Sequence, residues 1–250
     1  MATRTEVYES ERSWHNHRAV GHGKPPREVA QYEKRMWNRG LELMGDLHGT
    51  KILDVACGFG REAVLLAKRG ARVVGIDISE VSLEIARDLA SEEEVDVDFY
   101  SQNIDDIDYD SQFDIVYCRG ALHHFPDVEF TLTKCRDACR HDGLVISQEP
   151  KAENPFAEIG RLFFNPSTKY EHPFRLGELE GIFMRVFGNV RSEYHCLFVP
   201  LSFVFEKTKM RNLALRDIFG TCLERFDGLL PHGPLFKKYS WVELVWSSRI

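Results

Sequence analysis

The chain has 250 residues, of which 43% are hydrophobic, and a formal net charge of −7, which suits one elaborated domain or one domain with a small cap. Phosphate binding needs a basic face, so this charge argues against nucleic acid as a substrate. No apolar run approaches the roughly 20 residues that span a bilayer, and the polar N-terminus lacks a secretory signal, so we expect a soluble, cytoplasmic protein without membrane insertion.

Residues 1–50 precede the first predicted strand. A turn with glycine and proline between residues 21 and 26 is followed by a predicted helix from Arg27 to Met44 with apolar side chains near one face. Histidines at positions 15, 17 and 22 have no nearby cysteine or acidic cluster to complete a ligand set. We therefore expect exposed histidines and no bound metal, and the six cysteines, which lack paired zinc-ligand spacing, to be reduced thiols.

The segment Lys51–Gly60 is the most informative part of the chain. It predicts a short buried strand and then a turn with glycines at 58 and 60. A predicted helix from Arg61 to Arg69 and a second strand from Val73 to Asp77 follow. The glycines let the backbone approach a ligand, and the Asp77 carboxylate stands where it can accept hydrogen bonds from ribose hydroxyls. This unit predicts a cofactor that contains a nucleoside.

Two kinds of cofactor fit these glycines. The run Gly58-Phe59-Gly60-Arg61-Glu62-Ala63 also satisfies the dinucleotide fingerprint, so an NAD(P)-dependent oxidoreductase is an alternative. Asp54, at the end of the first strand, favours a cofactor that carries an ammonium or sulfonium group, because an anion there attracts such a cation but repels a pyrophosphate.

Strands and helices alternate from this unit to about residue 150. Ser79 is a good N-cap for a helix to about Ala90, and the remaining elements are strands at 95–100, 113–118 and 143–148 with a helix at about 129–140. This alternation predicts a parallel sheet with right-handed crossovers. Farther on, the pattern predicts an antiparallel strand near 191–201, a helical insertion at about 206–226 and a last strand at 241–247.

Over about residues 50 to 150 the chain resembles the class I S-adenosylmethionine-dependent methyltransferases, whose first motif is an acid followed by spaced glycines. Ala56 stands where the family often has its first glycine. The resemblance implies a doubly wound, Rossmann-like α/β fold: a mostly parallel seven-stranded sheet, with the antiparallel last strand between the fifth and sixth, plus helical cap elements. It divides the chain into an N-terminal helical lid (1–50), a cofactor-binding core (51–150), an acceptor-binding cap segment (151–190) and C-terminal strands with a helical insertion that complete the sheet (191–250).

The resemblance also implies S-adenosyl-L-methionine as cofactor, S-adenosyl-L-homocysteine as product and a small-molecule acceptor. Asp54 and the backbone of 56–60 would face the methionine moiety, Asp77 the ribose and Asn103 the adenine amino group, because an amide oxygen accepts that proton. Isoleucines would cover the adenine faces, and a carbonyl after the fourth strand would meet the ammonium. The implied cofactor-binding residues are Asp54, Ala56, Cys57, Gly58, Gly60, Asp77, Ile78, Asn103, Ile104, Cys118 and Arg119.

Methyl transfer from a sulfonium is an in-line displacement that mainly needs alignment and exclusion of water. A base is useful when the acceptor is a hydroxyl, and a histidine near neutral pKa can serve. His123, His124 and His172 are the catalytic candidates, so oxygen is favoured over nitrogen as acceptor. Structural or cofactor-shaping histidines are the competing interpretation, and a non-catalytic S-adenosylmethionine-binding protein is a further alternative to an enzyme.

The acceptor pocket is expected outside the Rossmann-like unit. In similar enzymes an N-terminal segment covers the cofactor, and Glu149 ends a strand at the ligand edge of the sheet. The cluster at 170–175 combines an acid, a base and an anion binder, for substrate recognition or for the cap's own hydrogen bonds. The candidate substrate-binding residues are Trp14, Arg18, Tyr32, Glu149, Tyr170, Glu171 and Arg175. No feature of the sequence specifies an oligomeric state.

Overall fold

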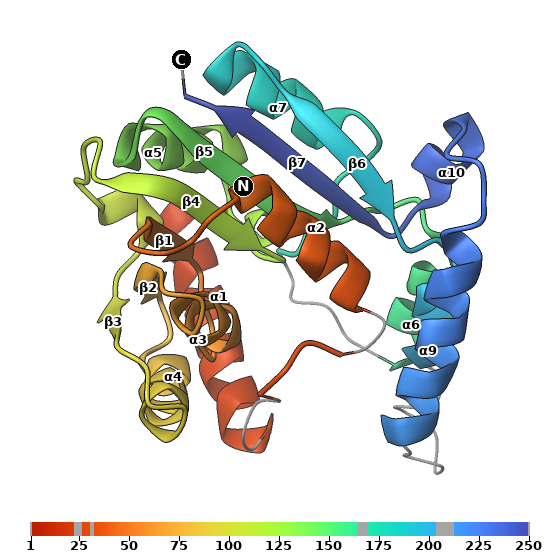
Figure 1. Ribbon diagram of the computed structural model, residues 1–250, viewed down its shortest axis with the longest axis horizontal. Coiled ribbons are helices and arrows are strands. Elements are labelled where there is room, and N and C mark those ends of the chain that lie inside the picture. The colour runs from red at the N-terminus through yellow and green to blue at the C-terminus, as the bar shows by residue number, and fades with distance from the viewer. Residues whose placement is uncertain (1, 23–26, 31–32, 165–169, 204–212, 250) are drawn as a thin grey trace.

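The computed structural model describes residues 2–22, 27–30, 33–164, 170–203 and 213–249. In these residues one seven-stranded sheet has helices packed on both faces (Figure 1). The strands are β1 (Lys51–Val55), β2 (Arg72–Asp77), β3 (Val97–Ser101), β4 (Phe113–Arg119), β5 (Cys139–Pro150), β6 (Arg191–His195) and β7 (Val242–Ser248).

The strand order across the sheet is β3-β2-β1-β4-β5-β7-β6. The first five strands pair in parallel, and β7 runs antiparallel to both of its neighbours, β5 and β6. The predicted doubly wound sheet, with the last strand between the fifth and the sixth, is therefore confirmed. This order reverses direction at β1 and β4, which is the point where open α/β sheets bind ligands.

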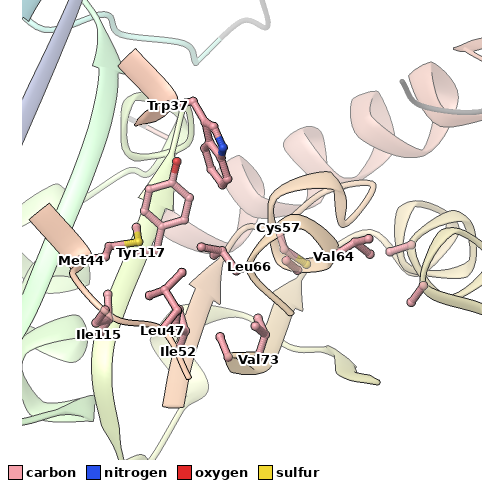
Figure 2. Packing of buried hydrophobic residues seen from close by; sticks show 14 of the residues in the cluster. Trp37, Met44, Leu47, Ile52, Cys57, Val64, Leu66, Val73, Ile115 and Tyr117 are labelled. Atoms are coloured by element: carbon pink, nitrogen blue, oxygen red, sulfur yellow. The ribbon is translucent and has the colours of Figure 1, made fainter. Parts of the chain in front are cut away.

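Two groups of helices bury the two faces of the sheet. Ile52 and Leu53 are neighbours on β1, so their side chains point to opposite faces. Ile52 packs in a first core with α2, α3 and α4, whereas Leu53 packs in a second core with α5 and α7. The Trp37 and Tyr117 rings meet edge to face in the first core, with centroids 6.5 Å apart (Figure 2).

The helices are α1 (Arg4–His22), α2 (Lys34–Met44), α3 (Arg61–Ala67), α4 (Glu80–Glu92), α5 (Val128–Ala138), α6 (Pro155–Phe164), α7 (Glu178–Phe187), α9 (Leu213–Asp227) and α10 (Pro234–Tyr239), with short 3-10 turns η2 (Ile104–Asp106), η3 (Leu122–His124) and η4 (Val199–Phe203). Among the described residues, no helix combines the length and the apolar character needed to cross a membrane.

Local chemistry sets the element boundaries around β3. The Ser79 hydroxyl caps α4, as predicted, by accepting a hydrogen bond from the Ser82 N–H at 3.1 Å. β3 begins later than predicted because the residues before it still belong to the end of α4. Glu94 has a φ of 53° there, and the Val95 N–H donates to the Ala90 carbonyl.

The N-terminal region differs most from the prediction. The helix predicted from Arg27 to Met44 is wrong at its start, since α2 begins at Lys34, and the sequence pattern does not reveal α1. The buried face of α1 includes the charged Glu11 as well as Val7 and Tyr8. A helix with so few apolar positions lacks the periodicity by which buried helices are recognised.

Polar contacts hold α1 across the carboxyl ends of the strands. The Ser79 hydroxyl, just past β2, donates to the Asn16 side-chain oxygen at 2.6 Å. At the other end of α1, Arg4 forms an ion pair with Asp127, the residue before α5. The helix therefore lies over the edge of the sheet where the cofactor site is predicted.

Candidate active site

A cavity of about 100 Å³ lies between this edge of the sheet and α1. Turns after four adjacent parallel strands and one face of α1 form its walls. The lining residues are Val55, Ala56 and Gly58 at the end of β1 and after it, Ile76, Asp77 and Ile78 at the end of β2 and after it, Gln102 and Ile104 after β3, Gly120, Ala121, His124 and Phe125 after β4, and Tyr8, Glu11 and His15 on α1. The site therefore includes one helix that the sequence pattern does not reveal.

The two glycines of the first turn have different roles. Gly58 lines the cavity at a φ of 53°, and apart from its chain neighbours no described residue has an atom within 4 Å of where its Cβ would be. A Cβ on Gly60, in contrast, would lie 2.7 Å from the Ala86 Cβ and 2.8 Å from the Phe99 ring. Gly58 thus leaves room for a ligand, whereas Gly60 lets α3 pack against α4 and β3.

Asp77 is held in a fixed orientation at the cavity wall. Its two carboxylate oxygens accept hydrogen bonds from the Gly58 N–H at 2.9 Å and the Ser79 N–H at 2.8 Å. Burial raises the pKa of this carboxyl, and the backbone donors act against that shift. The carboxylate is therefore oriented before any ligand binds.

After β3, the amide side chain that lines the cavity belongs to Gln102, one position before the predicted Asn103. The Asn103 side-chain oxygen accepts a hydrogen bond from the Asp105 N–H at 3.1 Å and caps η2. Gln102 lines the cavity instead, together with the predicted Ile78 and Ile104. Because either amide sits next to the same strand end, the sequence alone does not show which one faces a ligand.

Asp54 is buried beside the first turn. Burial, with the charges of Glu62 and Asp77, raises its pKa well above the usual range. One of its carboxylate oxygens has no hydrogen-bond partner among the described residues. A buried acceptor without a donor is costly, so Asp54 is suited to receive a cation or an N–H group from a ligand.

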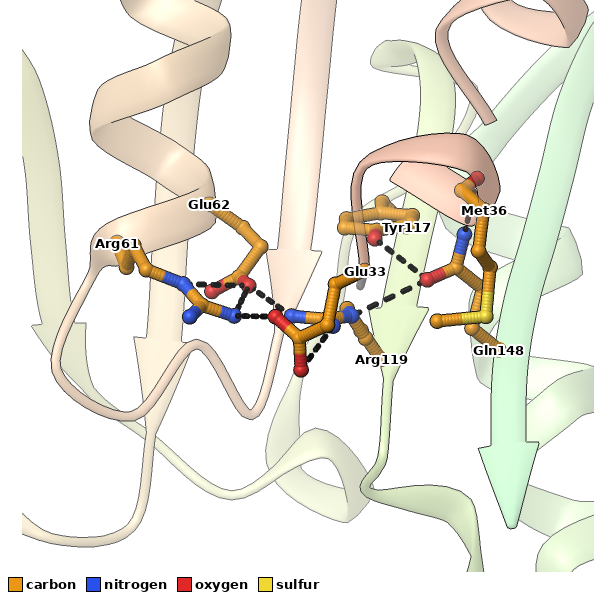
Figure 3. A network of polar contacts seen from close by, with 7 residues as sticks. All are labelled: Glu33, Met36, Arg61, Glu62, Tyr117, Arg119 and Gln148. Carbon is orange, nitrogen blue, oxygen red and sulfur yellow. Dashed lines mark hydrogen bonds and ion pairs between the residues drawn. The ribbon is translucent and has the colours of Figure 1, made fainter. Parts of the chain in front are cut away.

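A network of ion pairs surrounds Arg119 at the end of β4 (Figure 3). Arg119 pairs with Glu62 and, at 3.3 Å, with Glu33, which precedes α2. Arg61 pairs with the same two carboxylates, at 2.5 Å to Glu62 and 3.5 Å to Glu33. Burial acts to raise the pKa of Glu62, but the two guanidinium groups outweigh it and lower that pKa to about 2. The network thus ties α2 to the glycine turn through half-buried charges.

The other predicted residues of this region lie in the cores or the turns. Cys57 packs in the first core and Cys118 in the second. Ala56 adopts a φ of 54°, unusual for a residue with a Cβ, and lines the cavity.

The buried Glu149 organises the turn that carries the two histidines. Its carboxylate accepts hydrogen bonds from the N–H groups of Ala121 and Leu122 at 3.1 and 3.0 Å and from the Ser147 hydroxyl at 3.1 Å. It also lies 2.7 Å from His123 Nδ1. The contacts of Glu149 in this structure are therefore internal, and they set the orientation of the His123 ring.

The predicted segment at 170–175 reaches the same turn. Glu171 Oε1 lies 3.8 Å from His123 Nε2, and the His172 N–H donates to the His123 carbonyl at 2.8 Å. Tyr170 is half-buried, and Arg175 is exposed with its N–H donating to Glu178. None of these residues lines the cavity, whereas His124 does.

His124 faces α1. Its Nδ1 lies 3.1 Å from the carboxylate of Glu11, and the same carboxylate oxygen lies 3.7 Å from His15 Nε2. Burial and the neighbouring His124 lower the pKa of His15 to about 4. The expectation that His15 is solvent-exposed holds only in part, because its side chain is 34% exposed and also lines the cavity from a helix that the sequence pattern does not reveal.

The remaining candidates on the N-terminal segment lie away from the cavity or outside the described residues. Trp14 is half-buried, and the exposed Arg18 guanidinium lies 5.1 Å from the Trp14 ring centroid. Tyr32 lies outside the described residues. The residues of α1 that do line the cavity, with Gln102 and Phe125, are absent from the predicted set.

Comparison with known proteins agrees with this geometry. Residues 52–143 match the family model of a methyltransferase domain. The chain is 35% identical over 149 residues to the ubiquinone biosynthesis O-methyltransferase of Bordetella avium, which covers 55% of this chain and 61% of that protein. It is 39% identical over 107 residues to the protein of the same name from Alkalilimnicola ehrlichii, and the match covers 42% of this chain and 43% of that protein. The chain thus spans about half the length of the curated relatives it matches.

Solved structures share the fold over almost the whole chain. Magnesium protoporphyrin IX methyltransferase from Synechocystis PCC 6803 with bound S-adenosylmethionine has a TM-score of 0.61 at 15% identity, covering 98% of this chain and 97% of that one. The cyclase SpnF has a TM-score of 0.64 at 14% identity, covering 98% and 94%. At these identities the likeness concerns the fold alone. The match and the shared fold together show a methyltransferase domain at residues 52–143, on a sheet with the strand order expected from the resemblance.

Proposed function

We propose that this protein transfers a methyl group from S-adenosylmethionine to an oxygen of a small molecule. The observation that carries the proposal is the cavity itself. Its floor is the glycine turn with the fixed Asp77 carboxylate, and a histidine paired with a carboxylate, His124 with Glu11, lines the same space. A nucleoside cofactor and a reacting hydroxyl would therefore meet in one enclosed site.

The residues at the floor fit the cofactor. A carboxylate has about four lone-pair sites, so Asp77 can still accept ribose hydroxyls while it holds the Gly58 and Ser79 N–H groups. Ile78 and Ile104 would enclose the adenine, with Gln102 at its polar edge. The unsatisfied carboxylate oxygen of Asp54 would receive the methionine ammonium.

The sulfonium supplies an activated methyl group, so the protein's remaining tasks are to align the acceptor, exclude water and accept the proton of the hydroxyl. The aromatic residues Tyr8 and Phe125 also line the cavity, with ring centroids 6.2 Å apart. His124 and Glu11 are the polar pair beside the reacting oxygen. His123 would help to orient His124, because the two rings pack with centroids 4.1 Å apart. Glu171 and His172 contact His123 and would hold it in place.

Calorimetry with S-adenosylhomocysteine and with NAD tests the proposal. We expect the thioether to bind and NAD not to bind, and Asp77→Asn to weaken the thioether at least tenfold, because a hydrogen bond to a charged group is worth about 1.5–3 kcal/mol. Asp88→Asn, on the exposed face of α4, is the matched control. Tight binding of NAD without the thioether would replace the proposal with a dehydrogenase. The likeness to a cyclase shows that this fold alone does not establish methyl transfer.

A further inference from the structure

We propose that Glu11, His15 and His124 form a binding site for one divalent transition-metal ion, such as Zn²⁺. Glu11 and His15 are one turn apart on α1 and so share a face of the helix. His124 reaches the same point from η3, after β4. One ligand atom from each residue lies within 4.8 Å of the others.

The distances suit a shared ion. Glu11 Oε2 lies 3.1 Å from His124 Nδ1 and 3.7 Å from His15 Nε2. Zinc binds such nitrogen and oxygen atoms at about 2.0–2.2 Å, so two tetrahedral ligands of one ion lie roughly 3.4 Å apart. The three side chains therefore need only small movements to bind a cation at their centre.

The donor set selects the kind of ion. Two imidazoles and one carboxylate suit zinc and iron, whereas magnesium and calcium prefer oxygen ligands. Three protein ligands also leave coordination positions open. Because all three residues line the cavity, these positions face the space where an acceptor would bind.

Surrounding contacts hold the ligands in place. The Ser79 hydroxyl donates to Asn16, the residue after His15. On the other side, the His123 ring packs on His124 and is itself fixed by Glu149. These contacts fix α1 and the turn after β4, from which the three ligands project. A bound ion would also link α1 to the turn after β4.

The role of this ion rests on the proposed methyl transfer. A bound cation lowers the pKa of a coordinated hydroxyl, so the acceptor would release its proton to solvent on binding. Its oxygen would then form a bond to the methyl carbon while the bond from that carbon to sulfur breaks. The electron pair of the broken bond stays on sulfur, and the sulfonium becomes a neutral thioether. His124 would thus serve as a metal ligand.

Metal binding can be measured without any turnover. Protein stripped with a chelator is titrated with Zn²⁺ and with Mg²⁺ by calorimetry, and Co²⁺ loading is followed by its visible absorption. We expect one Zn²⁺ per chain, no comparable Mg²⁺ binding, and cobalt bands typical of imidazole ligation. His15→Ala and Glu11→Gln should weaken Zn²⁺ at least 100-fold. Glu9→Gln and His17→Ala, exposed on the same helix, should leave it unchanged.

Two outcomes overturn the metal site. The first is no stoichiometric Zn²⁺ binding by the wild-type protein, and the second is binding that His15→Ala and Glu11→Gln leave intact. The cobalt spectrum is measured on the wild-type protein, so it tests the site even if a variant fails to fold. If stripped protein binds S-adenosylhomocysteine and methylates at the wild-type rate, the metal inference fails and the proposed function stands. If Zn²⁺ binds but S-adenosylhomocysteine does not, the proposed function fails instead.

Discussion

Adding one methyl group at Gly58 or at Gly60 should separate cofactor binding from folding. Both positions have a left-handed backbone, with φ of 53° and 72°. In Gly60→Ala the new Cβ would lie 2.7 Å from Ala86 and 2.8 Å from Phe99, inside the first core. In Gly58→Ala it would meet no described atom within 4 Å beyond the chain neighbours, at a residue that lines the cavity.

The structure sets the expected sizes of the two effects. A residue with a Cβ in the left-handed region costs roughly 1–2 kcal/mol at either position. Overpacking a close-packed core adds roughly 1–3 kcal/mol, at Gly60 alone. We therefore expect the free energy of unfolding to fall by about 2–5 kcal/mol in Gly60→Ala and by about 1–2 kcal/mol in Gly58→Ala. Each kcal/mol corresponds to a fall in Tm of about 2–4 °C for a chain of this length.

Urea unfolding and calorimetry with S-adenosylhomocysteine measure the two effects. Gly60→Ala should be the less stable variant, yet its folded fraction should bind the thioether with nearly wild-type affinity. Gly58→Ala should bind at least tenfold more weakly, which corresponds to about 1.4 kcal/mol. Equal losses of stability, together with unchanged affinity in Gly58→Ala, would refute the division of roles between the two glycines.

The half-buried Glu62 and the buried Glu243 and Glu149 give further predictions. The pKa of Glu62 is lowered to about 2, so its ionised form stabilises the folded state by on the order of 3 kcal/mol above its unfolded pKa, and this stabilisation is lost as the pH falls toward about 2. Between about pH 6 and about pH 3, urea titrations should show a smaller fall in the free energy of unfolding for Glu62→Gln than for wild type. Equal falls would contradict this role of Glu62. Burial and the charge of Glu180 raise the pKa of Glu243 to about 8, so the folded state keeps a proton that the unfolded state releases above about pH 4.5. Glu243→Gln should therefore have a free energy of unfolding up to about 4 kcal/mol higher than wild type near pH 8. A less stable variant at that pH would contradict the raised pKa of Glu243. Glu149→Ala leaves the Ala121 and Leu122 N–H groups without their acceptor and should lower the free energy of unfolding by about 3 kcal/mol in urea; a change below about 1 kcal/mol would show that the turn is held by other contacts.

The sheet was predictable because its strands and turns carry local signals. The buried β1 before spaced glycines, the Ser79 cap and the acid at the end of β2 each have a short-range physical cause, and the structure shows all three. The strand order then followed from the resemblance to a family, and it is confirmed.

The wall of the cavity opposite the sheet was not predictable in the same way. α1 buries Glu11 and half-buries His15, so its buried face has no apolar period for a sequence pattern to detect. The pairing of Glu11 with His124 joins distant parts of the chain. Likewise, Gln102 and Asn103 are chemically alike, and only the cap that Asn103 forms on η2 shows that Gln102 faces the cavity.

Transfer of a labelled methyl group tests the proposed methyltransferase activity. The intact protein is incubated with S-adenosylmethionine labelled in its methyl group and a fractionated extract of small metabolites, and labelled products and S-adenosylhomocysteine are measured together. We predict a labelled ether product formed in equal amount with S-adenosylhomocysteine, and less of both with Asp77→Asn at a sub-saturating concentration of S-adenosylmethionine. Tight binding of S-adenosylhomocysteine without any labelled product from any fraction would contradict the account and identify a protein that binds the cofactor without transferring its methyl group.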